Sequence, residues 1–99
     1  MLIVTGTVRI PPERTEAARP VMTAMVTASR AEAGCLAYSY AVDVIDPGLV
    51  HVVERWEDEA SLSAHFQTDH MATWRAHWGE FGITDRQLAC YTVVDVRSI

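Results

Sequence analysis

The order in which strand-like and helix-like segments follow one another leaves few folds open to this chain of 99 residues. Four segments have the composition and alternation of strands, and two longer stretches repeat apolar residues at helical spacing. We expect strands at residues 2–10, 35–44, 49–57 and 87–96, and helical stretches at residues 13–33 and 58–80. The order predicts an α+β domain with the ferredoxin-like β-α-β-β-α-β arrangement, whose helices cover one face of a four-stranded antiparallel sheet.

Residues with special backbone preferences mark the ends of these elements. Gly34 stands where a left-handed helix cap is expected, and residues 46–48, Asp-Pro-Gly, indicate a turn that joins the second and third strands into a hairpin. Asp58 and Thr68 are expected to cap two successive helices, so that the second helical stretch is broken near residue 68. Pro20 cannot donate a helical hydrogen bond, so the first helix must either kink there or follow an irregular first turn.

The composition supports one folded domain over residues 1–99. A chain that is 49% hydrophobic and 21% charged can bury a core, and a single core usually holds roughly 100 to 200 residues. The formal net charge of −5 has the wrong sign for binding the phosphate backbone of nucleic acid. No stretch approaches the roughly 20 apolar residues that span a bilayer, so we expect no membrane contact and a cytoplasmic location.

Residue counts and spacings remove several kinds of cofactor chemistry. All eight basic residues are Arg, so the chain has no lysine for a Schiff base or a phosphate-binding loop. The five glycines fit no nucleotide-binding pattern. Cys35 and Cys90 are too few for a disulfide framework or a four-cysteine zinc site, and we expect both to be buried thiols without a role in the chemistry.

Both faces of the expected sheet carry apolar residues. In the third strand Trp56 points to one side and Val53 to the other, and in the fourth strand Val93 lies opposite Val94 and Val96. The helices can cover only one face, and a large exposed apolar patch is uncommon on a monomer. We therefore expect a two-fold homodimer in which a second copy packs against the helix-free face.

A ligand cavity is expected on the helix-covered face, between the sheet and the second helical stretch. Tryptophan and tyrosine side chains with a few imidazoles and one carboxylate suit a flat aromatic ligand that carries hydroxyl groups. The residues expected to bind this ligand are Tyr38, Tyr40, Glu54, Trp56, Phe66 and Trp74, and the candidate catalytic bases are His65 and His70.

The histidines also have a structural interpretation. Either His65 or His70 can be a core imidazole with a satisfied hydrogen bond, and Glu54 across the sheet is a candidate partner for His65. We expect no metal site, because His65 and His70 are five positions apart and point away from each other on an unbroken helix. His70 and His77 share a helix face, but no cysteine or carboxylate obviously completes a coordination shell.

The segment over residues 56–71, preceded by Glu54, resembles the antibiotic biosynthesis monooxygenase (ABM) family, and most closely its quinol monooxygenase branch. The resemblance extends over essentially the whole chain, and its most specific parts are the strings E-x-W at residues 54–56 and A-H-x-Q-T-x-H-M at residues 64–71. It implies ferredoxin-like dimers whose paired sheets form a barrel. It also implies oxidation of hydroquinones or polyketide phenols by molecular oxygen, with neither a metal nor a flavin as cofactor.

The pocket residues of two other branches of this family are only partly retained. Val52 and Leu62 stand where the polyketide-oxidising members have Asn and Tyr. The Asn, Trp and His of haem-degrading relatives correspond to Gly6, His65 and Arg75. The resemblance therefore favours quinol oxidation over polyketide oxidation or haem degradation.

The first functional hypothesis is a monooxygenase without a cofactor that acts on a hydroquinone or related phenol and O2. One of the two candidate histidines removes a phenolic proton, while Trp56 and Tyr38 orient the ring. Three alternatives remain. The dimer binds a small aromatic metabolite without turnover, or it isomerises a sugar-derived signalling phosphate with Arg9 or Arg75 in the pocket, or it is a dimerisation domain with a filled core beneath the broken helix.

Overall fold

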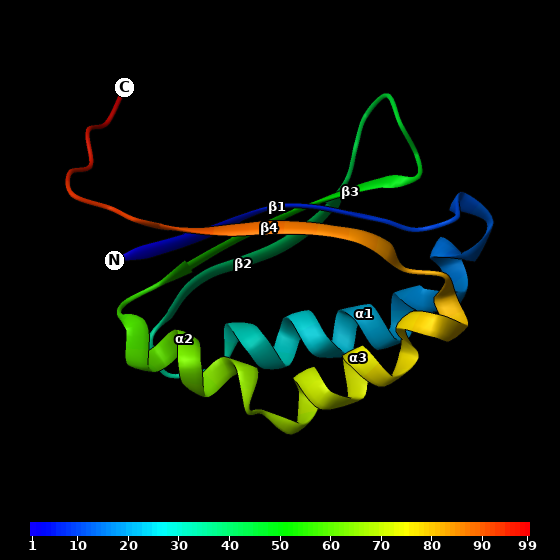
Figure 1. Ribbon diagram of the computed structural model, residues 1–99, viewed down its shortest axis with the longest axis horizontal. Helices are drawn as coiled ribbons and strands as arrows, with labels where there is room; N and C mark the ends of the chain where they lie inside the picture. The colour runs from blue at the N-terminus through cyan, green and yellow to red at the C-terminus, as the bar shows by residue number, and fades with distance from the viewer.

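The computed structural model describes residues 1–99 as two layers, a sheet and a group of helices on one of its faces (Figure 1). The elements occur in the expected order. The strands are β1 (Leu2–Arg9), β2 (Cys35–Val42), β3 (Leu49–Trp56) and β4 (Thr84–Thr92), and the helices are α1 (Thr15–Arg30), α2 (Glu59–Phe66) and α3 (Asp69–Phe81), with a 3-10 turn at Pro12–Arg14.

The four strands form one antiparallel sheet in the order β2-β3-β1-β4. The central strand β1 pairs with β3 on one side and with β4 on the other, so that Leu2 lies between Trp56 and Thr92. The consecutive strands β2 and β3 form the predicted hairpin. This strand order, with all helices on one face, is the ferredoxin-like α+β fold, and that prediction is confirmed.

Strand β3 shows how the side-chain alternation of a strand divides the two faces. Its residues 50, 52, 54 and 56 are buried, whereas residues 51, 53 and 55 are exposed. The buried set faces the helices, and the exposed set lies on the helix-free face. Glu54 and Trp56 therefore share the helix-covered face with Tyr38 of β2, which pairs with Glu54 in register.

The hydrophobic core fills the space between the sheet and the helices. Trp56 and Trp74 are its largest fully buried side chains, and burying a large apolar side chain contributes roughly 1.5–3 kcal/mol. The other buried hydrophobic residues in this core are Leu2, Val4, Val8, Ile10, Ala18, Met25, Tyr38, Val50, Leu62, Met71 and Phe81.

The helix starts follow the predicted signals. The Asp58 side chain accepts a hydrogen bond from Ser61 N at 2.8 Å and caps α2, and the Thr68 side chain accepts one from Met71 N and caps α3. The predicted break near residue 68 is confirmed. Pro20 lies inside α1, which follows an irregular 3-10 turn. None of the three helices has both the length and the apolar composition needed to cross a membrane.

The predicted bounds of the last strand are wrong. The strand covers Thr84–Thr92 rather than residues 87–96, and Val94 and Val96 are 97% and 70% exposed beyond its end. The pairing of β4 with β1 ends at the Leu2–Thr92 pair, and one further backbone bond runs from Val93 N to Met1 O at 3.0 Å. The expectation that residues 93–96 line two faces of a strand therefore fails.

Candidate functional site

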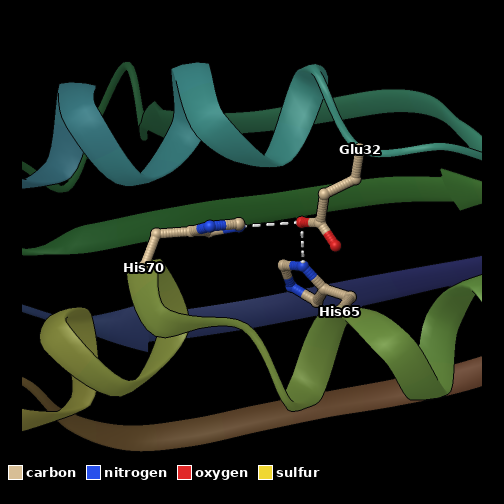
Figure 2. A group of neighbouring side chains, drawn as sticks. All are labelled: Glu32, His65 and His70. Atoms are coloured by element: carbon tan, nitrogen blue, oxygen red, sulfur yellow. Dashed lines mark hydrogen bonds and ion pairs between the residues drawn. The ribbon is translucent and has the colours of Figure 1, made fainter.

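Three polar side chains from different parts of the chain meet on the helix side of the sheet (Figure 2). Glu32 Oε2 accepts a hydrogen bond from His65 Nδ1 at 2.6 Å and another from His70 Nε2 at 2.8 Å. Glu32 lies in the turn between α1 and β2, His65 in the last turn of α2, and His70 in the first turn of α3. We call these three residues the Glu32 cluster.

The break between α2 and α3 makes this cluster possible. On one continuous helix, residues five positions apart diverge by roughly 140° around the axis. Here α2 ends at Phe66 and α3 begins at Asp69, and Thr68 Oγ1 both donates to His65 O at 2.8 Å and caps α3. The expectation that His65 and His70 point away from each other is wrong, because it assumed an unbroken helix.

The turn that carries Glu32 is fixed against the start of α2. Gly34 has φ of +82°, and a Cβ at this position would collide with the Ser61 side chain, so only glycine fits. Glu57 N also donates to Gly34 O at 2.8 Å. The backbone therefore places Glu32 beside the helix that carries His65.

The hydrogen bonds of the Glu32 cluster define which nitrogens carry protons. A carboxylate can only accept, so the proton lies on His65 Nδ1 and on His70 Nε2 when both imidazoles are neutral. Burial lowers the pKa of His65 from its usual value, and the bond to Glu32 opposes part of that effect. The far nitrogen of His65, Nε2, is buried without a hydrogen-bond partner. Both histidines thus keep one free acceptor nitrogen.

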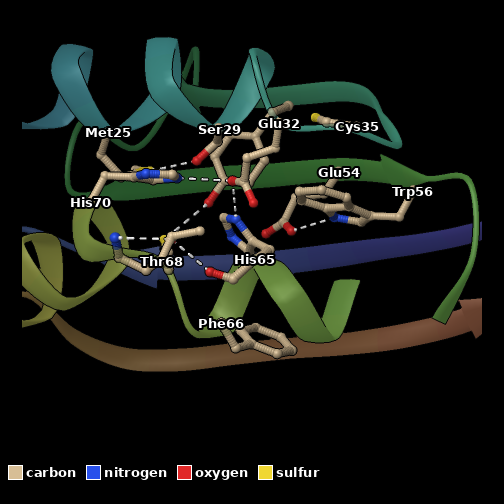
Figure 3. A network of polar contacts seen from close by, with 12 residues as sticks. Met25, Ser29, Glu32, Cys35, Glu54, Trp56, His65, Phe66, Thr68 and His70 are labelled. Carbon is tan, nitrogen blue, oxygen red and sulfur yellow. Dashed lines mark hydrogen bonds and ion pairs between the residues drawn. The ribbon is translucent and has the colours of Figure 1, made fainter. Parts of the chain in front are cut away.

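In the expected chamber between the sheet and α2, the His65 side chain lies beside Glu54 and Trp56 (Figure 3). The ring of His65 lies 4.7 Å from that of Trp56 and 5.3 Å from that of Tyr38, measured between centroids, and all three side chains are at most 2% exposed. None of the four main cavities is lined by Glu54, Trp56 or His65. The prediction of a cavity here is wrong, because the rings of Tyr38, Trp56 and His65 pack closely on one another, and this filled core is what the dimerisation-domain alternative expected.

Glu54 belongs to a separate polar contact within the same core. It is 4% exposed, and its Oε1 accepts a hydrogen bond from Trp56 Nε1 at 2.9 Å. Burial raises the pKa of this carboxyl group, and the bond from Trp56 partly opposes the rise. The expected pairing of Glu54 with His65 is replaced by the pairing of His65 with Glu32.

A cavity of about 350 Å³ does exist, but it lies between α1 and α3. The apolar side chains of Val21 and Met25 on α1 face His70, Trp74 and His77 on α3. Two predicted site residues, His70 and Trp74, therefore line the same cavity. One imidazole of the Glu32 cluster is thus a wall of a space large enough for a small aromatic molecule.

The remaining predicted residues lie outside this cavity. Tyr40 stacks on Tyr38 with centroids 5.9 Å apart and lines a smaller cavity of about 200 Å³ near Arg19. Phe66 is 41% exposed and contacts His65 from the outer side. The sequence reasoning missed Glu32, because nothing in its local sequence indicates that a turn residue faces two histidines more than 30 positions away.

Comparison with known proteins supports the resemblance seen in the sequence. The family model described as Antibiotic biosynthesis monooxygenase matches residues 1–77. Rv0793 of Mycobacterium tuberculosis, described as a candidate monooxygenase, is 33% identical over 69 residues, which cover 70% of this chain and 67% of that protein. The uncharacterized protein sll1783 of Synechocystis is 29% identical over 69 residues, and the match spans only 47% of its length.

Solved structures share the fold over nearly the whole chain. A Deinococcus radiodurans protein described as a candidate antibiotic biosynthesis monooxygenase superposes with a TM-score of 0.91 at 23% identity, covering 100% of this chain and 98% of that one. The structure of Rv0793 superposes with a TM-score of 0.74 at 25% identity, covering 99% and 98% of the two chains.

Proposed function

The chain belongs to the antibiotic biosynthesis monooxygenase family, and we propose that it oxidises a small hydroquinone or related phenol with molecular oxygen. One observation carries this proposal. The imidazole of His70 forms part of the wall of the α1–α3 cavity while its Nε2 donates to Glu32 Oε2 at 2.8 Å. A carboxylate that holds one ring nitrogen and leaves the other free is the arrangement of a general base.

The substrate ring occupies the α1–α3 cavity in this proposal. The volume of about 350 Å³ is at the small end of ligand pockets, which span roughly 300–1,000 Å³. Trp74 offers an aromatic wall to the ring, and Val21 and Met25 offer apolar contacts. No arginine lines this cavity, so it lacks the anion clamp that a phosphate isomerase requires.

His70 acts as the base that removes a phenolic proton. Its Nδ1 accepts the proton, and Glu32 stabilises the resulting imidazolium through the bond at Nε2. His65 donates to the same carboxylate oxygen at 2.6 Å and thereby fixes the position of Glu32. Glu32 and His65 are therefore positioning residues, and His70 is the catalytic one.

The electrons come from the substrate. The phenolate transfers one electron to O2, and the two radicals combine to form a carbon–oxygen bond. The O–O bond then breaks as water leaves. For a hydroquinone the balance is one hydroquinone and one O2 giving one hydroxyquinone and one water, with four electrons passing from carbon to oxygen. The protein supplies proton removal and orientation of the ring.

Oxygen uptake with a menadiol-like hydroquinone tests the proposal. The wild-type protein should consume O2 faster than autoxidation, and His70→Ala should lower the excess rate by about 10²- to 10⁴-fold, the usual contribution of a positioned base. His51→Ala, on the helix-free face and bonded to Asp43, should keep the wild-type rate. Ligand-dependent stabilisation without excess O2 uptake would instead identify a binding protein.

A further inference from the structure

The Glu32 cluster also has the composition of a metal site. Glu32, His65 and His70 each offer one ligand atom, and these atoms all lie within 4.8 Å of one another. The three residues come from a turn and two helices, so the fold rather than a local motif brings them together (Figure 2). The side chain of Glu32 is 14% exposed, that of His65 1% and that of His70 23%, so the three ligand residues are largely enclosed.

We propose that the Glu32 cluster binds one divalent transition metal ion, with Zn2+ as the representative ion. Two imidazole nitrogens and one carboxylate oxygen form the protein ligand set of catalytic zinc sites, which keep a fourth position open. The same donors suit other divalent first-row transition metal ions that bind imidazole nitrogen together with carboxylate oxygen. Mg2+ and Ca2+ favour sites made of oxygen atoms, so this set selects against them.

The present geometry is close to what the ion requires. Ligand atoms around a tetrahedral zinc lie roughly 3.3 Å apart, and the two N–O separations at Glu32 Oε2 are now 2.6 and 2.8 Å. Two imidazoles on one tetrahedral ion place their ring centroids roughly 5.2 Å apart, whereas those of His65 and His70 are 6.1 Å apart. An ideal tetrahedral site therefore needs the two rings to approach each other by roughly 1 Å and both N–O separations to lengthen by roughly 0.5–0.7 Å.

The movable members of the cluster can make this adjustment. His65 is fixed by its contacts with Trp56 and Tyr38. His70 borders the open α1–α3 cavity, and Glu32 lies in the turn between α1 and β2. Rotation of these two side chains opens a central position for the ion while the helix break keeps both imidazoles on the same side.

Zinc titration of the metal-free, tag-free chain by calorimetry tests this proposal. We expect one Zn2+ per chain, and we expect His70→Ala and Glu32→Gln each to weaken binding at least tenfold. His77→Ala, seven positions along the same helix but outside the cluster, should bind Zn2+ like the wild type. Replacing Zn2+ with Co2+ should give the visible absorption of a nitrogen- and oxygen-ligated ion, lost in His70→Ala. Circular dichroism checks that each variant is folded.

Two results would overturn the metal site. One is equal zinc affinity in the wild type and His70→Ala; the other is an equal loss in His77→Ala, which would indicate surface histidines. Because binding is measured without substrate, failure here leaves the proposed oxidation standing. If that oxidation holds, Zn2+ on His70 Nε2 moves the ring proton to Nδ1 and removes the free base, so stoichiometric zinc should inhibit the wild type.

Discussion

Glu54 and His65 are two ionisable side chains that lie almost fully buried against Trp56. Glu54 accepts a hydrogen bond from the indole, and the His65 ring lies 4.7 Å from the indole ring. Burial raises the pKa of Glu54 and lowers the pKa of His65, so it favours the neutral form of both groups. The core around Trp56 therefore disfavours a charge on either group.

Replacing Glu54 with glutamine should stabilise the protein at neutral pH. The pKa of Glu54 is raised above its usual 4.5 in the folded state, so the unfolded chain loses this proton first as pH rises. Stability is therefore lost from about pH 4.5 up to the folded-state pKa and stays lower above it. In Glu54→Gln the amide oxygen still accepts from Trp56 Nε1 and no charge develops, so thermal melting should show a higher Tm than wild type at pH 7.

The pH dependence separates this explanation from a simple packing change. The difference in Tm between Glu54→Gln and wild type should disappear below pH 4, where both side chains are neutral. Glu57→Gln, an exposed position on the same chain segment, should leave Tm unchanged at both pH values. A lower Tm for Glu54→Gln at pH 7 would mean that the ionised carboxylate stabilises the fold.

The position of a site residue was predictable where secondary structure alone decides which face of the strand or helix its side chain occupies. Alternation along β3 correctly placed Glu54 and Trp56 on the helix-covered face, and helical spacing correctly placed Trp74 in the core. Glu32 was not predictable, because its position depends on how the turn at Gly34 packs against α2. A contact between residues 33 positions apart has no signal in local sequence.

At the scale of elements, the break between α2 and α3 brings His65 and His70 to the same carboxylate, Glu32. Thr68 makes two bonds with one hydroxyl group, donating to His65 O and accepting from Met71 N. The first bond lies at the C-terminal end of α2, and the second caps the N-terminal end of α3. Because His65 and His70 lie on opposite sides of this residue, the hydroxyl group controls whether both can reach Glu32.

Removing the Thr68 hydroxyl should weaken both the fold and the site. Thr68→Ala should lower the free energy of unfolding by about 1 kcal/mol, the usual cost of losing an N-cap. It should also lower the rate of hydroquinone oxidation, because His70 loses its fixed position relative to Glu32. Urea unfolding and oxygen uptake measure the two effects, and Thr68→Ser, which retains the hydroxyl, should stay close to wild type in both. Full activity in Thr68→Ala would show that the break does not position His70.

Local signals predicted some element boundaries and not others: the predicted cap at Gly34 is wrong, because α1 ends at Arg30 and Ala31 is its cap. Asp58 and Thr68 are residue types that favour the N-cap position, and both were correctly predicted as the N-caps of α2 and α3. The end of β4 has no such signal, because Val93, Val94 and Val96 continue an apolar run that suits a strand. The pairing with β1 ends at the Leu2–Thr92 pair, with one further bond from Val93 N to Met1 O, and Val94 and Val96 lie beyond it. The length of β4 is therefore set by its pairing with β1 and not by its own sequence.

At the scale of the whole molecule, the helix-free face of the sheet exposes apolar side chains that no other part of the chain covers. Val53 and Tyr91 on this face are 43% and 56% exposed. The β2–β3 connection and the C-terminal segment both project on this side of the sheet (Figure 1). Their apolar side chains are among the most exposed of the chain: Val44, Ile45, Val94, Val96 and Ile99.

We propose that a second copy of the chain covers this face in a two-fold dimer. Two sheets can stack face to face, and the projecting segments of each copy then contact the edges of the other. A stable interface buries roughly 800 Å² on each partner. The exposed apolar residues would then be explained as interface residues.

An arginine in the middle of the helix-free face should separate the copies. Val53 lies on β3, one of the two inner strands, and pairs with Thr5 of β1, so Val53→Arg places an unpaired charge inside the interface. Light scattering coupled to gel filtration should give twice the mass of one chain for the wild type and a single-chain mass for the variant. Ala72→Arg, exposed on α3 among the helices, adds the same charge on the opposite side and should remain dimeric. A single-chain mass for the wild type would mean that the helix-free face is open to solvent and that the exposed valines and isoleucines need another explanation.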